Sequence, residues 1–510
     1  MFEQEFISIF IYFVLMILIG FYAFFKNRDN AESYLLGDRN LGPAVTALSA
    51  GASDMSGWLM MGLPGAMITQ GYTGFWIVFG LLMGAYGNYR IIAPRFRVFT
   101  QLTANAITIS DYFERRFLNN SHYLRLISAL IIIIFFTIYC ASGLVAGGKL
   151  FYTAFEVNYH LGMIITASVV ICYTLFGGFL AVSLTDFVQG CIIMIALVMV
   201  PLVVINDLNG WSNFTQLLNQ SDFNFKEIYT GISVISIISA LAWGLGYFGQ
   251  PHILVRFMSI KSVKHLPSAR RIGMSWMFIS ICGAIGVGLS GLTYLNANHQ
   301  SLTDPETIFI YLSQILFHPL VYGFLLAAIL AAIMSTISSQ LLVCSSSLTE
   351  DFYLVFFNRQ ASQHQLVIVS KISVFLVAVI SILLALDETT SILKLVSNAW
   401  AGFGAAFGPL IMLSLFWPKM NSATALTGMI SGALTVIFAI YVPIFGNGIT
   451  MSDYIYEIIP GIIASFLCMA FCHKLTGGAN QQCQKQFFEL QNGFLKMQNE
   501  TSNSLEFQQT

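Results

Sequence analysis

Two polar interruptions in long apolar stretches contain the side chains whose types and spacing suggest chemistry. The first is residues 51–57, GASDMSG, which place the carboxylate of Asp54 between glycines inside a hydrophobic run. The second, residues 243–251, combines aromatic rings, three glycines and a proline. Backbone that leaves a helix at membrane depth exposes carbonyl and N–H groups, which can bind a cation and a carboxylate. We therefore expect a binding site where the two interruptions meet.

Asp54 is the only carboxylate well inside an early apolar stretch. An ionised group at that depth is unfavourable unless it is paired, solvated or next to a cation. One interpretation is that Asp54 lies beside a bound cation. The alternative is that it caps the second half of a broken helix by accepting N–H bonds near Gly57. Both hold together if the cap also shapes a cation site.

The composition indicates a polytopic membrane protein. Only 9% of the 510 residues are charged and 56% are hydrophobic, whereas a soluble domain has about 25% charged residues. The net charge of −1, with no basic stripe, disfavours a nucleic-acid partner. The cysteines lie in apolar runs at irregular spacing, apart from Cys483 in a polar tail, and indicate no disulfide framework or zinc site.

The elements that position the interruptions are long apolar helices. A helix needs about 20 apolar residues to cross the hydrocarbon core, and the sequence predicts thirteen such segments in an all-α fold. They run approximately over residues 6–25, 42–67, 72–93, 124–151, 159–183, 187–206, 228–258, 272–296, 320–346, 366–386, 396–417, 423–443 and 454–473. Residues 306–317 are apolar on one face but too short to span, so we expect them on the membrane surface.

The distribution of Lys and Arg predicts the orientation. With the N-terminus outside, all of these residues except Lys149, Lys226 and Lys394 fall in inner loops or the tail. Cytoplasmic loops retain basic residues, so the sequence predicts a multi-pass protein of the cytoplasmic (inner) membrane with its C-terminus inside. Arg39 and Arg256 are explained by this topology alone, or by inner-gate pairing with Asp38 or Asp186.

The two interrupted segments are the second and the seventh, five helices apart. A repeat unit with an odd number of spans has opposite orientations in its two copies, so segments two to six and seven to eleven are expected to be inverted repeats. The predicted organisation is a first helix and inner loop (1–41), a transport core (42–417, with repeats 42–227 and 228–417), two C-terminal helices (418–474) and a solvated cytoplasmic tail (475–510).

At six stretches the chain resembles the sodium/solute symporter family, and within it the sodium/proline branch. The stretches are LGPAVTALSAGASDMSGWLMMGLPGA from Leu41, FFTIYCASGLVAG from Phe135, GGFLAVSLTD from Gly177, WGLGYFGQPHILVRFM from Trp243, AAIMSTISSQLLVCSS from Ala331 and NAWAGFGAAFGP from Asn398. The resemblance covers about residues 6–473. It implies a five-plus-five inverted-repeat (LeuT-like) core with broken second and seventh helices.

The resemblance also implies a sodium site between the second and ninth segments. Its ligands would be the carbonyls of Ala52, Met55 and Ala332 and the hydroxyls of Ser335 and Thr336, with Asp54 nearby. Na⁺ is a hard cation that favours oxygen ligands. The alternative is that both hydroxyls bond back within their own helix or connect neighbouring helices.

Aromatic residues around the interruptions are suited to surround a small, partly apolar ring with a charged nitrogen. The candidates are Trp58, Tyr139, Trp243, Tyr247 and Phe248. Simple core filling is the rival explanation, because aromatic residues make up 14% of the chain. Ser56 and Gly57, at the start of the outer half of the second segment, are the candidates for holding the solute carboxylate.

Asp186 begins the sixth predicted segment, where a carboxylate is commonly a helix cap, and we expect it to cap. The alternative is a second sodium site or an inner exit route that Asp186 forms with Ser338 and Ser339. Those hydroxyls lie one turn inward of Ser335.

The sequence therefore predicts a Na⁺-coupled symporter that imports L-proline by alternating access, with Na⁺ and the lipid bilayer as further partners. It predicts no enzyme activity and no organic cofactor. Another small solute, such as a carboxylate vitamin, another amino acid or a sugar, is the alternative. ATP is not expected, because Leu150 stands where a phosphate-binding loop needs Ser or Thr. A channel or an intramembrane enzyme is disfavoured, since no charged filter ring and no base beside a nucleophile is apparent.

Overall fold

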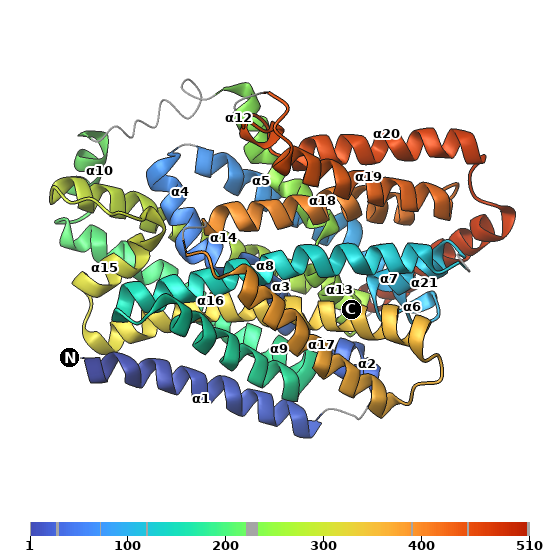
Figure 1. The fold of residues 1–510 in the computed structure, drawn as a ribbon, viewed down its shortest axis with the longest axis horizontal. Coiled ribbons are helices and arrows are strands. Elements are labelled where there is room, and N and C mark those ends of the chain that lie inside the picture. Colours follow the sequence, from blue (N-terminus) through green and yellow to red (C-terminus); the bar gives the residue numbers. More distant parts are fainter. Residues whose placement is uncertain are drawn as a thin grey trace.

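The structure is a computed structural model that describes residues 2–26, 30–71, 73–118, 121–220, 233–388, 391–445 and 448–506. Within these ranges the fold is helical, apart from one parallel bridge between Leu41 and Ile260. Most of the long helices lie roughly parallel, with α1 (Phe2–Lys26) along one edge and α20 (Ile458–Thr476) along the opposite edge (Figure 1).

The remaining elements are long helices and the shorter helical segments between them. The first half contains α2 (Ala31–Leu36), η1 (Gly37–Arg39), α3 (Pro43–Gly57), η2 (Trp58–Gly62), α4 (Leu63–Thr69), α5 (Thr73–Gly87), η3 (Asn88–Ile92), α6 (Ala93–Leu102), α7 (Ile109–Arg116), α8 (Tyr123–Phe155), α9 (Tyr159–Asp207) and α10 (Trp211–Gln220). The second half contains α12 (Val234–Leu241), η4 (Ala242–Gly249), α13 (Pro251–Ser259), η5 (Val263–His265), α14 (Leu266–Ala297), η6 (Pro305–Thr307), α15 (Ile308–Leu316), α16 (Pro319–Ser346), η7 (Ser347–Phe357), α17 (Gln363–Leu384), α18 (Ile392–Phe416), α19 (Ser422–Tyr441), η8 (Met451–Asp453) and α21 (Gln481–Glu506).

In the described residues, 10 helices are long and apolar enough to cross a membrane, or up to 11 if α12–η4 and α13 form one bent span. The prediction was thirteen. The difference between thirteen and eleven arises at two places. The second predicted segment is divided into α3, η2 and α4, and the fifth and sixth segments are both contained in α9. The count of thirteen and the inverted repeat stay predictions. The predicted start of the seventh segment, residues 228–232, and Lys226 lie outside the described residues.

The division within α9 differs from the predicted one. We expected one segment to end at residue 183 and the next to begin at 187, but the helix bends at Gly178, where φ is +55° and ψ is −152°. A Cβ at Gly178 would lie 2.7 Å from the carbonyl oxygen of Tyr34. Only glycine combines this backbone conformation with so close a contact. Asp186 therefore lies well inside a helix, and the prediction that it is an N-terminal cap is wrong.

The amphipathic stretch 306–317 forms η6 and α15. At 9 residues α15 is too short to span, as expected, but its side chains Ile308, Phe309, Ile310 and Leu312 are buried against neighbouring helices. Its apolar face therefore packs against the bundle, and its position at the membrane surface stays a prediction.

The C-terminal segment is not the solvated tail that we expected. Residues 481–506 form α21, which packs against α6, α7 and η5 at the end of the molecule opposite the N-terminus (Figure 1). One stripe of the helix is buried, namely Cys483, Phe487, Leu490 and Phe494. The spacing of 4, 3 and 4 residues is an amphipathic pattern, which the high content of Gln and Asn obscured.

At the same end, Arg39 contacts segments that are distant in the sequence. Its guanidinium donates to the side chain of Asn105 and to the carbonyl oxygens of Ala106 and Met258 at 2.6–2.9 Å. Burial, with a smaller contribution from the charge of Arg97, lowers the pKa of Arg39 to about 10, so the group stays charged at neutral pH. Among the described residues, its guanidinium bonds to neither Asp38 nor Asp186, so the alternative that Arg39 pairs with one of these carboxylates finds no support.

Candidate functional site

The first predicted interruption is a break at Ser56, at the end of α3. Ser56 has φ +43° and ψ −170°, a conformation that residues with a Cβ rarely adopt. Its Oγ accepts the N–H of Trp58 at 3.1 Å. Ser56 rather than Asp54 therefore caps the turn that follows. The alternative interpretation of Asp54 as the cap is wrong, because its carboxylate faces another helix.

The second interruption is the 3₁₀ segment η4, which the extended residue Gln250 separates from α13 at a bend of 44°. Neighbouring helices satisfy the carbonyls that this segment frees. Asn88 Nδ2 donates to the Tyr247 carbonyl at 2.9 Å, and Trp400 Nε1 donates to the Trp243 carbonyl at 2.8 Å. The bend occurs next to Pro251, inside the interruption at residues 243–251.

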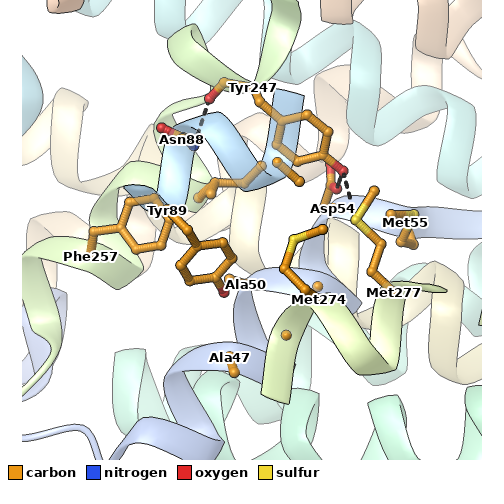
Figure 2. Close-up of a pocket in the computed structure, with 14 residues that line it drawn as sticks. Ala47, Ala50, Asp54, Met55, Asn88, Tyr89, Tyr247, Phe257, Met274 and Met277 are labelled. Atoms are coloured by element: carbon orange, nitrogen blue, oxygen red, sulfur yellow. Dashed lines mark hydrogen bonds between the residues drawn. The ribbon is translucent and has the colours of Figure 1, made fainter. Parts of the chain in front are cut away.

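The two interruptions meet through Asp54. The phenol of Tyr247 donates to Asp54 Oδ2, and the phenol of Tyr139, from α8, donates to the Asp54 backbone carbonyl at 3.2 Å. Figure 2 shows the side chains of Asp54 and Tyr247 pointing toward each other from α3 and η4. The carboxylate is thus buried at the junction of the broken helices, where the sequence predicts the binding site.

A small aromatic cavity lies beside this junction. It has a volume of about 10 Å³, close to the space that one water molecule needs. The residues that line it are Asp54, Met55, Trp58, Leu81, Tyr139, Trp243, Tyr247, Val396 and Trp400. The indole N–H of Trp58 is buried and has no hydrogen-bond partner among the described residues. Trp58 therefore brings an unpaired donor to the residues that line the cavity.

Stacked rings separate this cavity from a wider vestibule. Trp58 stacks on Trp243 at 5.9 Å between centroids, and Trp243 stacks on Tyr456 at 5.2 Å. Beyond Trp243 and Tyr456 the vestibule has a volume of about 590 Å³ and a polar wall that includes Lys394 and Glu457. The rings therefore form the closed entrance to the aromatic cavity.

Asp54 and Tyr247 also border a second cavity, drawn in Figure 2, of about 20 Å³. Its wall is mostly apolar. The other lining residues are Ala47, Ala50, Gly51, Met55, Ala85, Asn88, Tyr89, Ile253, Phe257, Gly273, Met274 and Met277. Asp54, Met55 and Tyr247 thus border both cavities.

Four oxygens of the predicted sodium site lie together between α3 and α16. Ser335 Oγ lies 2.8 Å from the Ala52 carbonyl oxygen and 3.1 Å from that of Ala332. Thr336 Oγ1 lies 3.5 Å and 3.2 Å from the same two atoms. Two carbonyls and two hydroxyls are suitable ligands for a hard monovalent cation. The Met55 carbonyl accepts the N–H of Trp58, and its role as a ligand stays a prediction.

A second buried polar cluster surrounds Asp186. Its Oδ2 accepts from Ser49 Oγ at 2.7 Å, from Arg256 at 3.1 Å and from Ser339 Oγ at 3.3 Å. Arg256 also donates to Ser49 and Ser339, so the cluster joins α3, α9, α13 and α16. The sequence left open whether Arg256 reflects topology alone or also pairs with a carboxylate. In the structure it pairs with Asp186.

Comparison with known proteins decides the family. Residues 34–432 match the profile of the Sodium:solute symporter family. This chain belongs to the sodium:solute symporter family. Two relatives named "Sodium/proline symporter", from Staphylococcus aureus strains JH9 and N315, are each 52% identical over 484 residues, which cover 93% of this chain and 93% of each relative. The chain is accordingly a transporter and not an enzyme.

The symporter also resembles a solved structure. A Na⁺-coupled sialic acid symporter in a substrate-bound outward-open state, described as having a novel Na⁺ site, superposes with a TM-score of 0.80 at 21% identity. The match covers 94% of this chain and 99% of that one. At this identity the likeness supports the fold alone, that of a polytopic helical transporter.

The structure brings most of the predicted residues of the symporter together, but not all. Ser56, Gly57 and Phe248 do not line the aromatic cavity in this conformation. A Cβ at Gly57 would meet Ala146 and Ile333, and the Phe248 ring lies against Gly87. Their contact with the solute stays a prediction.

At the second predicted sodium site, Asp186 and Ser339 are in contact, whereas Ser338 Oγ donates to the Ser335 carbonyl in its own helix. The Arg256 guanidinium binds Asp186 Oδ2, whereas Asp186 Oδ1 has no hydrogen-bond partner among the described residues. That site also stays a prediction.

Several residues of the site had no signal in the sequence. Leu81, Val396 and Trp400 line the cavity, and Asn88 holds η4 from η3. Leu81, Val396 and Trp400 lie in apolar helices, where an inward-facing side chain looks like any other. Trp400 differs from the others, because its indole N–H is the kind of donor that the freed carbonyls of an unwound segment need.

Proposed function

We propose that this chain is a Na⁺-coupled symporter that imports L-proline across the cytoplasmic membrane by alternating access. One observation carries the proposal: the last two turns of α3, together with the first residue of η2, contribute to both candidate sites. The Ala52 carbonyl belongs to the oxygen cluster, while Asp54, Met55 and Trp58 line the aromatic cavity. A cation that fixes these turns also fixes the cavity, which is the coupling that symport requires.

The cavity chemistry supports a small cyclic amino acid. The unpaired indole N–H of Trp58 is a donor for a carboxylate. The ring of Trp400, and that of Trp243 once it separates from Trp58, suit an apolar ring with a charged nitrogen. The carboxylate of Asp54 adds negative charge for a cation or for that nitrogen. Because the closed cavity is so small, a proline ring requires outward movement of the stacked aromatic rings. A sugar or a vitamin requires a larger movement of these rings.

Two further features support the proposal. The relatives that bear the name sodium/proline symporter match the chain over nearly its whole length. The helices rich in Arg, α6 and α7, lie at the end of the bundle opposite the N-terminus (Figure 1). With basic residues retained inside, the N-terminus would be outside and α21 in the cytoplasm. We expect the thirteen-helix, inverted-repeat arrangement to underlie this topology.

In the proposed cycle, Na⁺ replaces the hydrogen bonds between the hydroxyls of Ser335 and Thr336 and the two carbonyls. The bound cation holds α3 in the form that receives proline from the vestibule. Inward opening then requires the Asp186–Arg256 cluster to separate, because it joins four helices. Na⁺ drives this cycle only to the extent that it binds the two states with different affinity.

The test is uptake of radiolabelled L-proline into proteoliposomes that contain the purified protein. An inward Na⁺ gradient should drive accumulation, whereas a K⁺ gradient or a proton gradient should not. Excess unlabelled proline should compete, and glucose or pantothenate should not. Uptake that is independent of Na⁺, or competition by those larger solutes, would contradict the proposal.

A further inference from the structure

Lys394, a lysine with an unpaired charge, lines the outer vestibule. It lies in the first turn of α18 and is exposed, and its ammonium has neither an ion-pair nor a hydrogen-bond partner among the described residues. By contrast, Lys149 is paired with Asp304 and Glu306 at 2.9 and 3.0 Å. Topology does not explain Lys394, because basic residues are retained inside. Its charge is therefore available to a ligand in the vestibule.

A buried carboxylate lines the same vestibule. Glu457, at the start of α20, is 2% exposed. Its Oε2 accepts from Ser452 Oγ at 2.7 Å, and the Asn398 amide, in the orientation that satisfies its hydrogen bonds, donates to Oε1 at 3.0 Å. Both donors are neutral, and no cation of the described residues forms an ion pair with this carboxylate. Since a buried charge is unfavourable without an opposite one, Glu457 is suited to bind a positively charged group.

The two charges share one cavity without contacting each other. Lys394 nevertheless acts on the carboxylates around it: together with the hydrogen bonds from Thr450, which contribute more, its charge lowers the pKa of Asp453, another lining residue. Separate charges of opposite sign match a molecule that carries both, which is the zwitterion of an amino acid. The vestibule volume of about 590 Å³ lies within the range of small-molecule sites.

Tyr456 connects this pair of charges to the closed entrance of the aromatic cavity. It directly precedes Glu457, and its ring stacks on that of Trp243 at 5.2 Å between centroids. Its phenol donates to the Ser397 carbonyl at 3.1 Å, and Ser397 lies three residues after Lys394 on the same helix. A solute held by Lys394 and Glu457 is therefore next to the rings that must separate before it can enter.

We propose that the outer vestibule contains an entry subsite for zwitterionic amino acids, in which Lys394 binds the carboxylate and Glu457 binds the charged nitrogen. The inference rests on the proposed symport and deepens it, because it names where the solute is held before the rings open. From this subsite the solute enters the aromatic cavity when Trp243 and Tyr456 separate. Because Lys394 is in contact with water, the subsite should be weak, with a Kd on the order of millimolar.

A subsite on the entry route changes rates more than final affinity. It increases the probability that an encounter leads to binding, and the same contacts are used when the solute returns to the outside. Removal of the Lys394 charge should therefore slow both association and dissociation at the aromatic cavity. We expect the rate constant for Na⁺-dependent proline association to fall about 5-fold in Lys394→Gln, with the equilibrium Kd within about 2-fold of the parent protein.

The main experiment measures occupancy of the vestibule directly. In the full-length protein the native cysteines are replaced by Ser, and Ser397→Cys introduces a single thiol at the vestibule wall. Modification of this thiol by a membrane-impermeant maleimide is followed in K⁺ buffer without Na⁺, with and without proline. At a proline concentration of about ten times the Kd of the subsite, modification should be about 10-fold slower. Stopped-flow measurement of proline association uses the protein with its native cysteines and is independent of this background.

Matched variants make the result specific. Lys394→Gln and Glu457→Gln should each remove the protection by proline, and Lys394→Arg should keep it. Lys419→Gln removes an exposed lysine just beyond the other end of α18 and should leave protection unchanged. Prolinamide, which lacks the carboxylate, should protect the parent protein no better than proline protects Lys394→Gln.

Three outcomes would overturn the subsite. Absence of protection by proline is the first. Equal protection in the parent protein and in Lys394→Gln would assign the effect to the aromatic cavity. Protection that is lost only in Glu457→Gln would leave this residue with a structural role at the start of α20.

The failure of this inference is distinguishable from failure of the proposed function. Protection is measured without Na⁺ and without transport, and Na⁺-driven proline uptake is measured on the same protein. Normal uptake without protection would refute the subsite alone. Protection that depends on Lys394, in a protein that does not take up proline with Na⁺, would refute the proposed function alone.

Discussion

At the scale of single residues, the side-chain hydroxyl of Thr336 is the group whose chemistry is most directly tied to cation binding. It lies within 3.5 Å of two carbonyls from different helices. Without a cation the hydroxyl can only donate to those carbonyls, whereas with a cation all the oxygens can turn their lone pairs toward it. The same atom therefore has a different partner in each step of the cycle.

Thr336→Ala should weaken Na⁺ coupling. Loss of one oxygen ligand costs about 1–3 kcal/mol, which corresponds to roughly 5- to 150-fold in affinity. We expect the Na⁺ concentration for half-maximal proline uptake to rise by that factor, and Thr336→Ser to restore it. Thr293→Ala, which removes a buried hydroxyl bonded only to its own helix, is the control. An unchanged Na⁺ dependence in Thr336→Ala would contradict the sodium assignment.

Tyr247→Phe should destabilise the protein through Asp54. The carboxylate would lose the phenol that donates to it, and a hydrogen bond to a charged group contributes about 1.5–3 kcal/mol. SDS titration in mixed micelles, without Na⁺ or proline, measures the free energy of unfolding. In a double-mutant cycle with Asp54→Asn, the coupling energy should be of the same size. Additive effects would show that the two groups do not interact.

At the scale of elements, the backbone irregularities have different origins. At Ser56 a residue with a Cβ is held in a strained conformation by its surroundings, whereas at Gly178 the absence of a Cβ is what permits the bend. The first irregularity lies at the candidate site, where strain is commonly found. The second lies where α9 passes Tyr34, and it sets the direction of the helix that contains Asp186.

Gly178→Ala should prevent correct folding or strongly destabilise the protein. The added Cβ would require an unfavourable positive φ and would clash with Tyr34, and these effects together cost at least about 2 kcal/mol. Gly42→Ala, where φ is −72° and no atom lies within 4 Å of the added Cβ, is the matched control. The yield of monodisperse protein and the SDS midpoint are the measurements. Equal values for both variants would contradict this account of the bend.

At the scale of the whole molecule, α21 packs against the Arg-rich end of the bundle. The Arg116 guanidinium lies 4.8 Å from the centre of the Phe487 ring, and that of Arg95 lies 5.3 Å from the centre of Phe494. The helix thus packs across α6 and α7 together with η5, the turn that follows α13. Movement of α13 during transport must be compatible with this contact.

Phe487→Ala should loosen α21 and lower the stability of the whole protein. Phe487 is 2% exposed, whereas the adjacent Phe488 is 51% exposed. Truncation of a buried Phe costs about 3–5 kcal/mol in a core, which is an upper limit for a helix that can detach. We expect a clearly lower midpoint of thermal unfolding for Phe487→Ala and almost no shift for Phe488→Ala. Equal shifts would mean that α21 does not dock through this stripe.

The sequence by itself determined the membrane character, the long helices, the two breaks and the residues at the junction. These features are local: apolar runs set by the hydrocarbon thickness, and glycine and proline that interrupt them. The same local information located Asp54 and Tyr247, because each lies inside an interruption.

Only the tertiary structure decided which partners those residues meet. The contact of Asp186 with Arg256, the Trp400 bond to η4, the contacts of Tyr456 with Trp243 and Ser397, and the docking of α21 all join segments far apart in the chain. Because α9 bends at one glycine, Asp186 lies in a helix interior and not at the helix end that the sequence predicted. Burial and pairing depend on the packing of several helices at once, so no spacing within one segment could reveal them.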